Sequence, residues 1–520
     1  MLLFTYDGLI MTDTHAIPQA TVTNRDFAKG AGTTVLARLG AVFEVVSQPL
    51  YVLMFGLAGY GLYAVLWAVI TLVENIADLG MPAALQRVVP QSATPEDEAA
   101  ALRAAMIIGV VPALLIALVA SLCAPLIAPL FNVAAADSAI LVQAIRVYAW
   151  TLPLWAFCEV ATAALRSKRM FGAEIRLRLV WEQLIRLVLA ALLFFAGFGT
   201  MALIYAHIVS LILISLLAVR LLSGYFDLRL VWRARGRRAI GRLMLKAGLA
   251  VLPANIVGRI FTDGPALILN WLLPGAAGAV STALYVIARK VSSMVQLVRQ
   301  AFGYVLAPLA SAASTGQADE VRTIYGFVTR LSFALALPIG AVIIGGGPAI
   351  LRAFGGDAAI AFPALVILTI ARVVEAVIGG AGSIQQVTGG FRSQLVGSLA
   401  GLVLATVIAA IMMPDWGLTG MALAVGVGLA TAAIVPLYQL HILDQLHPFA
   451  PPFARVMAKS LLISGGVTGI AFAMLRLPLW VQLPVLIVVQ LAALWVSARF
   501  ALPFEDRKTL GKLARKLKLV

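Results

Sequence analysis

MALIYAHIVSLILISLLAV, residues 201–219, decides the class of this protein, because nineteen successive residues carry one histidine and no charged side chain. A helix rises about 1.5 Å per residue, so this run crosses a hydrocarbon core of roughly 30 Å. Similar runs recur along all 520 residues, of which 62% are hydrophobic and 12% charged. The sequence therefore predicts an all-α polytopic membrane protein. It excludes a soluble enzyme, a disulfide scaffold, a disordered chain and an outer-membrane barrel.

The apolar runs predict fourteen membrane-spanning helices. Their approximate bounds are 33–56, 60–80, 104–128, 138–165, 174–197, 200–222, 247–273, 279–304, 322–345, 358–388, 392–413, 417–440, 456–475 and 480–500. The connecting segments alternate in charge: 166–178, 229–246 and 507–518 are rich in Lys and Arg, whereas 56–61, 195–200 and 274–278 hold no basic residue. Because basic loops stay in the cytoplasm, both termini are predicted to be cytoplasmic.

The net charge of +16 comes mainly from these basic loops and tail, so we expect no nucleic-acid partner. Cys123 and Cys158 fall in apolar runs, which predicts buried thiols rather than a disulfide. The first residues lack a basic region and a small-residue cleavage site, so we expect no removable signal peptide. Leucines alternate with basic residues over 509–520, which predicts either a helix on an anionic leaflet or a solvated tail.

The two halves of the chain resemble each other at one offset. Met201-Ala202-Leu203 recurs 220 residues later as Met421-Ala422-Leu423. An offset that spans six helices returns the chain to the same side of the membrane, so the repeat is parallel. The predicted parts are a cytoplasmic segment 1–32, a first six-helix lobe 33–223, a basic cytoplasmic linker 224–242, a second six-helix lobe 243–440, two further helices with their loop 441–500, and a basic tail 501–520. Two such lobes enclose a central cavity and can rock about it.

Arg259, Arg289 and Arg372 lie near mid-span, where a charge costs about 2.5–3.5 kcal/mol on insertion scales. Such groups face a cavity or a partner, and guanidinium groups bind phosphate through paired hydrogen bonds. We therefore predict that these three arginines bind a pyrophosphate, with helical spacing selecting Arg289 over its neighbour Lys290. Uncharged polar residues predicted to line the same cavity are Gln48, Thr71, Asn75, Asn255 and Gln296.

Carboxylates in the same stripes are candidates for coupling to a proton or sodium gradient: Glu44, Glu74, Asp263 and Glu375. A second interpretation stays open, in which Arg259–Asp263 and Arg372–Glu375 only neutralise each other within their helices. Spacing favours that interpretation for Glu182–Arg186, and Arg299 is expected to reach the headgroups. No signature of a metal site, a cofactor, a nucleotide-binding loop or a catalytic nucleophile is present in the sequence.

Two short stretches carry a family resemblance: residues 56–63 read GLAGYGLY, and residues 77–85 read ADLGMPAAL. They resemble the polysaccharide biosynthesis, or oligosaccharide flippase, family of the multidrug/oligosaccharidyl-lipid/polysaccharide exporter superfamily. That family commonly shows a Gly- and Tyr-containing turn before its second helix and an Asp-Leu-Gly ending after it. The local match covers about 33–90, and the helix count extends it over 33–440.

The resemblance implies a transporter, not an enzyme. It would move an undecaprenyl-pyrophosphate-linked oligosaccharide across the bacterial inner membrane by alternating access. The cargo would be a precursor of a surface polysaccharide such as lipopolysaccharide or exopolysaccharide, and a polysaccharide polymerase would be a partner.

Three alternatives stay open. Lipid II flippases carry arginines on their first, second and eighth helices; Arg38 and Arg289 correspond loosely, but Glu74 and Asp78 depart from that pattern. An ion-coupled multidrug or cation antiporter would need carboxylates and aromatic residues rather than mid-membrane arginines. A membrane-embedded glycosyltransferase would need a large outer loop, and no predicted loop is long.

Overall fold

A computed structural model describes residues 24–168, 170, 175–233, 238–299, 318–387, 391–449, 451–510 and 512–519, with backbone only over 24–46 and at short stretches elsewhere. In these residues every regular element is a helix, and ten helical stretches are long and apolar enough to cross a membrane. The prediction of an all-α polytopic membrane protein is therefore confirmed. Ten stretches are fewer than the fourteen predicted, in part because α1 (Asn24–Ala77) contains both 33–56 and 60–80 and α18 (Phe391–Asp444) contains both 392–413 and 417–440.

The elements of the first part are α1 (Asn24–Ala77), α2 (Met81–Val88), η1 (Val89–Gln91), α3 (Pro95–Leu122), α4 (Ala124–Ile127), η2 (Ala128–Leu130), α5 (Ala135–Tyr148), α6 (Thr151–Ser167), η3 (Ile175–Trp181), α8 (Glu182–Phe195), α9 (Met201–Leu222) and α10 (Leu228–Arg233). Those of the second part are α11 (Arg238–Leu272), α12 (Ala276–Ser292), η4 (Ser293–Val295), α14 (Ala318–Gly345), α15 (Gly347–Arg352), η5 (Gly356–Ala361), α16 (Phe362–Ile378), α17 (Gly380–Val387), α18 (Phe391–Asp444), α19 (Pro451–Ala473), η6 (Met474–Arg476), α20 (Leu479–Phe500), α21 (Phe504–Thr509) and α22 (Lys512–Lys516).

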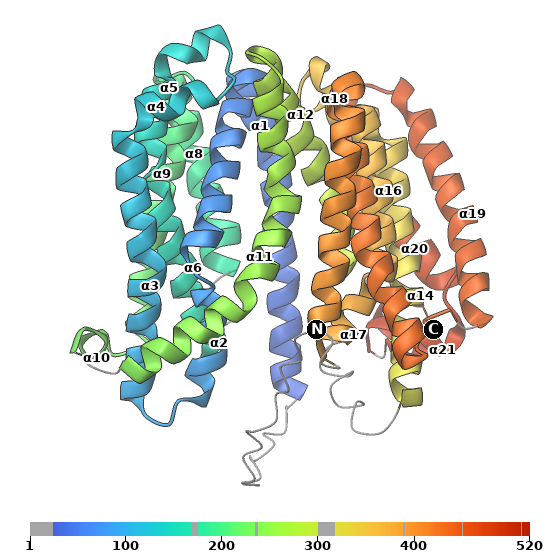
Figure 1. Ribbon diagram of the computed structural model, residues 1–520. Helices are drawn as coiled ribbons and strands as arrows, with labels where there is room; N and C mark the ends of the chain where they lie inside the picture. The colour runs from blue at the N-terminus through green and yellow to red at the C-terminus, as the bar shows by residue number, and fades with distance from the viewer. Residues whose placement is uncertain are drawn as a thin grey trace.

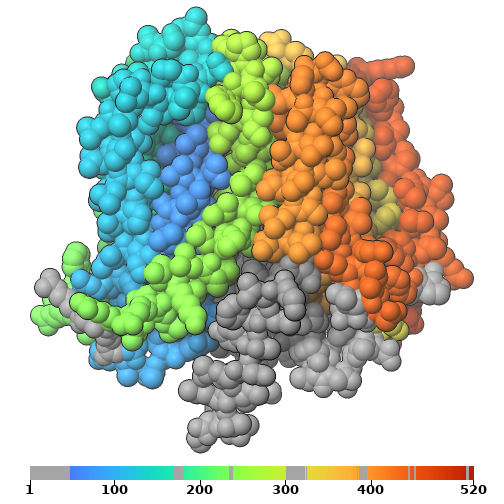
Figure 2. All heavy atoms as spheres, in the orientation of Figure 1, coloured from blue at the N-terminus to red at the C-terminus, as the bar shows by residue number. Residues whose placement is uncertain are grey.

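Two groups of helices stand side by side (Figure 1). One holds α3, α5, α6, α8 and α9, and the other holds α14, α16, α18, α19 and α20. Helix α11 crosses obliquely between them: its first turns pack on α2 and α3, and it also packs on α18 (Figures 1 and 2). The predicted second lobe begins at residue 243, so part of its first helix lies against the other group.

Glycines with left-handed backbone mark the turns between paired spans. Gly197 (φ 86°) and Gly417 (φ 48°) stand 220 residues apart, each between two membrane-spanning segments. Gly56 (φ 70°) and Gly275 (φ 56°) occupy the corresponding turns earlier in each half. Only glycine adopts these angles without strain, and the turns reverse the chain within few residues. The repeat seen in the sequence is thus also present in backbone geometry.

The residues that carry the family resemblance shape contacts between α1, α2 and the second half. A Cβ added to Gly61 would lie 2.0 Å from the Ala279 carbonyl oxygen on α12, so α1 and α12 touch backbone to backbone. Asp78 accepts a hydrogen bond from the Gly80 amide at 2.8 Å and caps the sharp turn after α1. Gly80 has a φ of 72°, and a Cβ there would lie 2.4 Å from the Gly248 carbonyl oxygen on α11.

The last two long helices, α19 and α20, pack on α14 and on each other. Arg330 of α14 makes a paired contact with Asp506, at 2.6 and 2.8 Å. The basic tail folds back on this group, because the Trp495 indole donates to the Leu517 carbonyl at 3.0 Å and Leu519 is buried. The sequence predicted either a helix on the membrane surface or a solvated tail. In the structure, the described part of the tail instead packs partly on the protein.

Both cysteines are free, and Cys158 is buried while Cys123 is half-buried. The prediction of two unpaired thiols in apolar surroundings is therefore confirmed for the pairing, and for burial at Cys158.

Candidate functional site

A cavity of about 670 Å³ opens between the two groups of helices, and we call it the central cavity. Trp67 and Thr71 of α1 and Trp155 of α6 line it from one side. The second half of the chain lines the rest, with α11, α12, η4, the helical residues 296–299, α16 and α18. The central cavity therefore lies where the two halves meet.

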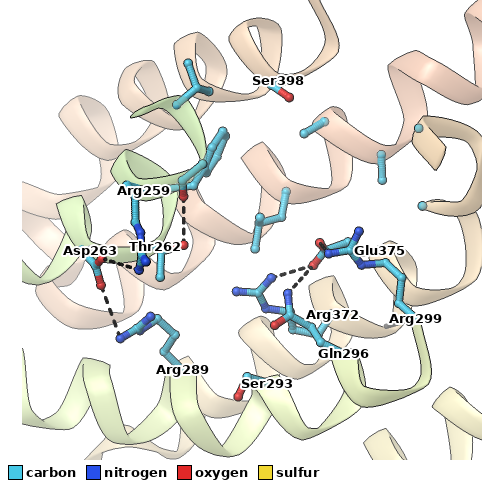
Figure 3. Close-up of a pocket in the computed structure, with 18 of the residues that line it drawn as sticks. Arg259, Thr262, Asp263, Arg289, Ser293, Gln296, Arg299, Arg372, Glu375 and Ser398 are labelled. Atoms are coloured by element: carbon cyan, nitrogen blue, oxygen red, sulfur yellow. Dashed lines mark hydrogen bonds and ion pairs between the residues drawn. The ribbon is translucent and has the colours of Figure 1, made fainter. Parts of the chain in front are cut away.

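One charged group in the central cavity is built around Asp263 of α11, and we call it the Asp263 group (Figure 3). The Asp263 carboxylate faces Arg259 Nη1 at 3.6 Å and Arg289 Nη2 at 3.7 Å. Thr71 Oγ1 donates to the same carboxylate at 2.9 Å. Since Thr71 belongs to α1, this hydrogen bond joins the two halves of the protein across the cavity.

A second charged group is built around Glu375 of α16, and we call it the Glu375 group (Figure 3). Arg372 Nη1 donates to the Glu375 carboxylate at 2.6 Å, and Gln296 Nε2 donates to it at 3.2 Å. Arg299 Nη2 faces the other carboxylate oxygen at 3.4 Å. All of these residues belong to the second half of the chain.

Local backbone explains why so many residues of one segment reach the cavity. Helix α12 ends at Ser292, and the 3₁₀ turn η4 follows before the helix resumes at 296. A 3₁₀ turn advances about 120° per residue instead of about 100°, so it shifts the face that the next turn presents. Gln296 and Arg299, which follow this turn, therefore line the same cavity as Arg289 and Lys290, which precede it.

The central cavity carries an excess of positive charge. Among its described lining residues, five are cationic (Arg259, Arg289, Lys290, Arg299 and Arg372) and two are anionic (Asp263 and Glu375), which leaves a formal charge of +3. The Nε atoms of Arg289, Arg299 and Arg372 are buried and make no hydrogen bond within the described part of the chain. The site therefore offers surplus charge and spare donors to an anion with several oxygens.

The predicted site residues divide between the cavity and its surroundings. Lining residues are Arg259, Arg289, Arg372, Thr71, Gln296, Asp263 and Glu375. Gln48 does not line it, because the chain reverses at Gly56 and Tyr60 donates a hydrogen bond to the Gln48 amide oxygen. Asn255 lies one turn before Arg259 and is exposed outside the lining, and Asn75 is half-buried and does not line the cavity either.

The remaining predicted coupling residues are Glu74 and Glu44. Glu74 of α1 is 1% exposed and does not line the cavity; its Oε1 atom has no hydrogen-bond partner among the described residues. Glu44 lies in α1 where only the backbone is described, so its side chain falls outside the described residues.

Several site residues were missed in the sequence. Lys290 lines the cavity together with Arg289, contrary to the prediction that only one would. Arg299 was expected at the headgroups, but it points to Glu375. Arg178 was taken for a loop residue; it lies on the π-helix η3, pairs with Glu159 at 2.6 Å and stacks on the Trp155 ring at 3.9 Å. Its place among basic loop residues hid this role.

A smaller cavity of about 250 Å³, which we call the side cavity, adjoins the central one. In its wall, Arg186 donates to the Tyr63 hydroxyl at 3.0 Å and to Gln183, and lies 3.0 Å from His207 Nε2. Glu182 lies 3.8 Å from Arg186, and Tyr148 lies 2.8 Å from His207 Nδ1. The Glu182–Arg186 pair expected from the sequence is thus part of a buried polar network.

Comparison with known protein families identifies the family of this chain. The model of the polysaccharide biosynthesis protein family matches residues 54–358, which is more than half of the chain. The chain belongs to the polysaccharide biosynthesis protein family. The match includes both stretches that carry the resemblance and both predicted arginines of the Asp263 group, whereas Arg372 lies beyond it. A search of curated proteins finds no significant match.

Solved structures show that this family member has the fold of the MOP superfamily. The lipid II flippase MurJ, in an inward closed conformation, is 12% identical with a TM-score of 0.69, over 89% of this chain and 97% of that one. An inward-facing multidrug resistance MATE transporter is 16% identical with a TM-score of 0.67, over 79% and 94%. A MOP superfamily transporter from Pyrococcus furiosus is 18% identical with a TM-score of 0.56, over 79% and 95%. At these identities the likeness establishes the fold.

Proposed function

We propose that this protein flips an undecaprenyl-pyrophosphate-linked oligosaccharide, the precursor of a surface polysaccharide, across the inner membrane of a bacterium. It works by alternating access of the central cavity to the two sides. Membership of the polysaccharide biosynthesis family and the MOP fold support this role. A polysaccharide polymerase that consumes the flipped unit is the expected partner, and both termini lie in the cytoplasm.

The observation that carries the proposal is the cationic lining of the central cavity. A pyrophosphate diester carries two negative charges and several oxygen acceptors, which match the surplus of +3 and the spare Nε donors of Arg289 and Arg372. Planar guanidinium groups bind phosphate oxygens in pairs, and they do so more strongly where water is excluded. The same surplus opposes an organic cation, although Trp67 and Trp155 offer aromatic faces.

Asp263 and Glu375 hold the arginines in place when the cavity is empty. The Asp263 contacts of 3.6 and 3.7 Å are long for charge-assisted hydrogen bonds, so phosphate oxygens compete with this carboxylate at little cost. When phosphate oxygens replace the Asp263 carboxylate on the arginines, this carboxylate is free to move. The Thr71–Asp263 hydrogen bond between the two halves can then break. Binding of the headgroup is thereby linked to the contact that joins the halves, while the polyprenyl tail stays in lipid.

Glu74 is the strongest of the predicted coupling residues. Asp263 and Glu375 are held between arginines, whereas Glu74 has a buried oxygen without a partner in the described chain. A carboxyl in such a place is protonated or takes up a cation, and a change between these states favours one conformation over another.

We expect Glu74→Gln to bind lipid pyrophosphate normally but to lose the dependence of transport on an imposed proton or sodium gradient. Transport into vesicles with and without each gradient measures this effect, and Glu74→Asp serves as the control that keeps the charge. Unchanged gradient dependence in Glu74→Gln would remove this residue from the coupling role.

The proposal is tested by mass spectrometry of polyprenyl-linked lipids from a deletion strain and its parent. We expect one undecaprenyl-pyrophosphate glycan to accumulate and the matching surface glycan to disappear. Accumulation of the peptidoglycan precursor would indicate a lipid II flippase instead. Unchanged lipids and glycans, together with altered resistance to toxic cations, would indicate a drug or cation antiporter and overturn the proposal.

A further inference from the structure

The side cavity and the central cavity share part of their lining. Trp67, Trp155, Asp263, Arg289 and Lys290 line both cavities. A phosphate group held by Arg289 therefore lies at the entrance of the side cavity. The next part of the same ligand, on the side away from the lipid tail, is placed to enter it.

The walls of the side cavity combine aromatic rings with polar groups. Tyr60, Tyr63, Trp67 and Trp155 contribute rings, and two of these, Trp67 and Trp155, meet edge to face with their ring centroids 4.7 Å apart. Gln183 adds an amide that both donates and accepts. A sugar ring matches such walls, because its C–H faces are apolar and its hydroxyl groups both donate and accept hydrogen bonds.

The cations that line only the side cavity have carboxylate partners. Arg178 pairs with Glu159 at 2.6 Å, and Arg186 lies 3.8 Å from Glu182 in its buried network. The excess of positive charge in its lining comes from Arg289 and Lys290, which it shares with the central cavity. The part of the side cavity away from these two residues thus suits a neutral polar group, while the shared wall and the central cavity suit an anion. The side cavity's volume of about 250 Å³ lies just below the usual range of roughly 300–1,000 Å³ for small-molecule pockets, which fits one sugar ring.

Trp155 supplies an independent indication of a ligand. Its side chain is 8% exposed, it lines both cavities, and its indole Nε1–H makes no hydrogen bond within the described residues. A buried donor without an acceptor is unfavourable, so such donors usually meet a ligand or a water. The Arg178 guanidinium, 3.9 Å from the ring centroid, holds the indole in a defined plane.

We propose that the side cavity binds the sugar residue that is joined directly to the pyrophosphate. Trp155 packs on this sugar and donates its N–H to a sugar oxygen, while Arg289 holds the adjacent phosphate. This assignment rests on the proposed function, since it divides one substrate between two neighbouring cavities. It makes the first sugar a determinant of which lipid-linked glycan the protein accepts.

The test compares binding of four lipids to the purified full-length protein in nanodiscs, by thermophoresis. The probes are undecaprenyl pyrophosphate without sugar, and the same lipid carrying a single glucose, galactose or N-acetylglucosamine. We expect at least one single-sugar lipid to bind about tenfold more tightly than the sugar-free lipid. Trp155→Phe keeps an aromatic ring and removes the N–H. We expect it to bind that single-sugar lipid about 3- to 10-fold more weakly than the parent protein does.

Trp155→Ala should remove the gain completely, so that this variant binds single-sugar and sugar-free lipids with equal affinity. Trp480→Phe, on the exposed face of α20, is the matched control and should change nothing. Equal binding of sugar-free and single-sugar lipids, or a sugar gain that survives both Trp155 variants, would overturn the sugar site alone. Failure of every one of these lipids to bind would overturn the proposed function as well.

Discussion

The Asp263 group and the Glu375 group of the central cavity have similar components but differ in the lengths of their contacts and in the half of the chain that supplies the partners. Each places one carboxylate between two arginines. In the Asp263 group the ion pairs are 3.6 and 3.7 Å long, and Thr71 ties the carboxylate to the opposite half. In the Glu375 group the closest contact is 2.6 Å, and every described partner belongs to the second half.

The difference indicates separate tasks. In the Asp263 group the long ion pairs to Arg259 and Arg289 are weak, and the hydrogen bond from Thr71 crosses between the halves and must break when they part. Short, buried contacts within one half keep their geometry, and removing one partner leaves a charge unpaired. We infer that the Asp263 group responds to the substrate and that the Glu375 group is a fixed anchor for part of the same anion.

The largest expected effect comes from removing the responsive arginines. Arg259→Gln with Arg289→Gln removes two charge-assisted contacts to the pyrophosphate, each worth about 1.5–3 kcal/mol, so export should fall by more than about 100-fold. Lipid accumulation in cells and surface glycan staining measure the loss. Arg220→Gln with Arg229→Gln, both exposed outside the central cavity, is the matched control. Full export by the double variant would refute the pyrophosphate assignment.

The next effect separates the two carboxylates by stability. Glu375→Gln leaves Arg372, whose side chain is 9% exposed, without its close partner, and should destabilise the protein by about 3 kcal/mol or more. Asp263→Asn should cost less, about 1–2 kcal/mol, because Arg259 is 33% exposed. Thermal exposure of the buried Cys158 thiol to a fluorescent thiol reagent reports both melting midpoints. A lower midpoint for Asp263→Asn than for Glu375→Gln would reverse the comparison.

A smaller effect should follow from cutting the tie between the halves. Thr71→Val keeps the volume and removes the 2.9 Å hydrogen bond to Asp263, which is worth about 0.5–1.5 kcal/mol. We expect a 2- to 10-fold change in transport rate with little change in affinity for undecaprenyl pyrophosphate. Thr262→Val, whose hydroxyl bonds within its own helix, is the control. An equal loss of affinity in Thr71→Val would place Thr71 in substrate binding instead.

The smallest effect is expected at Arg299. Its side chain is 39% exposed and lies 3.4 Å from Glu375, so solvent screens the pair. Arg299→Gln should lower stability by less than about 1 kcal/mol, whereas Glu375→Gln on the same contact costs several times more. Both melting midpoints come from the thiol assay, and similar shifts for the two variants would show that the Glu375 group is held by Arg299 rather than by Arg372.

Much of the fold and part of the site could be predicted from sequence. The apolar runs locate the helices because length and hydropathy decide membrane insertion. Arg259, Arg289 and Arg372 were placed at the cavity because a mid-membrane charge needs a polar surrounding, and that constraint acts on each residue alone.

The rest depended on the path of the backbone. Arg299 reaches the cavity after η4 interrupts the regular helix, and no residue type in the sequence predicts that turn. Gln48 misses it because Tyr60 approaches from the next helix after the turn at Gly56. The sequence placed Arg178 among the basic loop residues, whereas in the structure it lies on the π-helix η3 and stacks on the Trp155 ring. Such long-range contacts carry no local signal.

The backbone contact between Gly61 and Ala279 bears on how ions are kept from leaking between the two halves. A transporter that leaks protons or ions dissipates the gradient on which its host depends. Interlocking side chains would seal the junction between the halves, but they would also resist its parting. A seam of bare backbone at Gly61 closes without such interlocking and leaves no room for water, since even a single methyl group does not fit. In the proposed alternating access, the halves would part and close again at this contact without disengaging side chains.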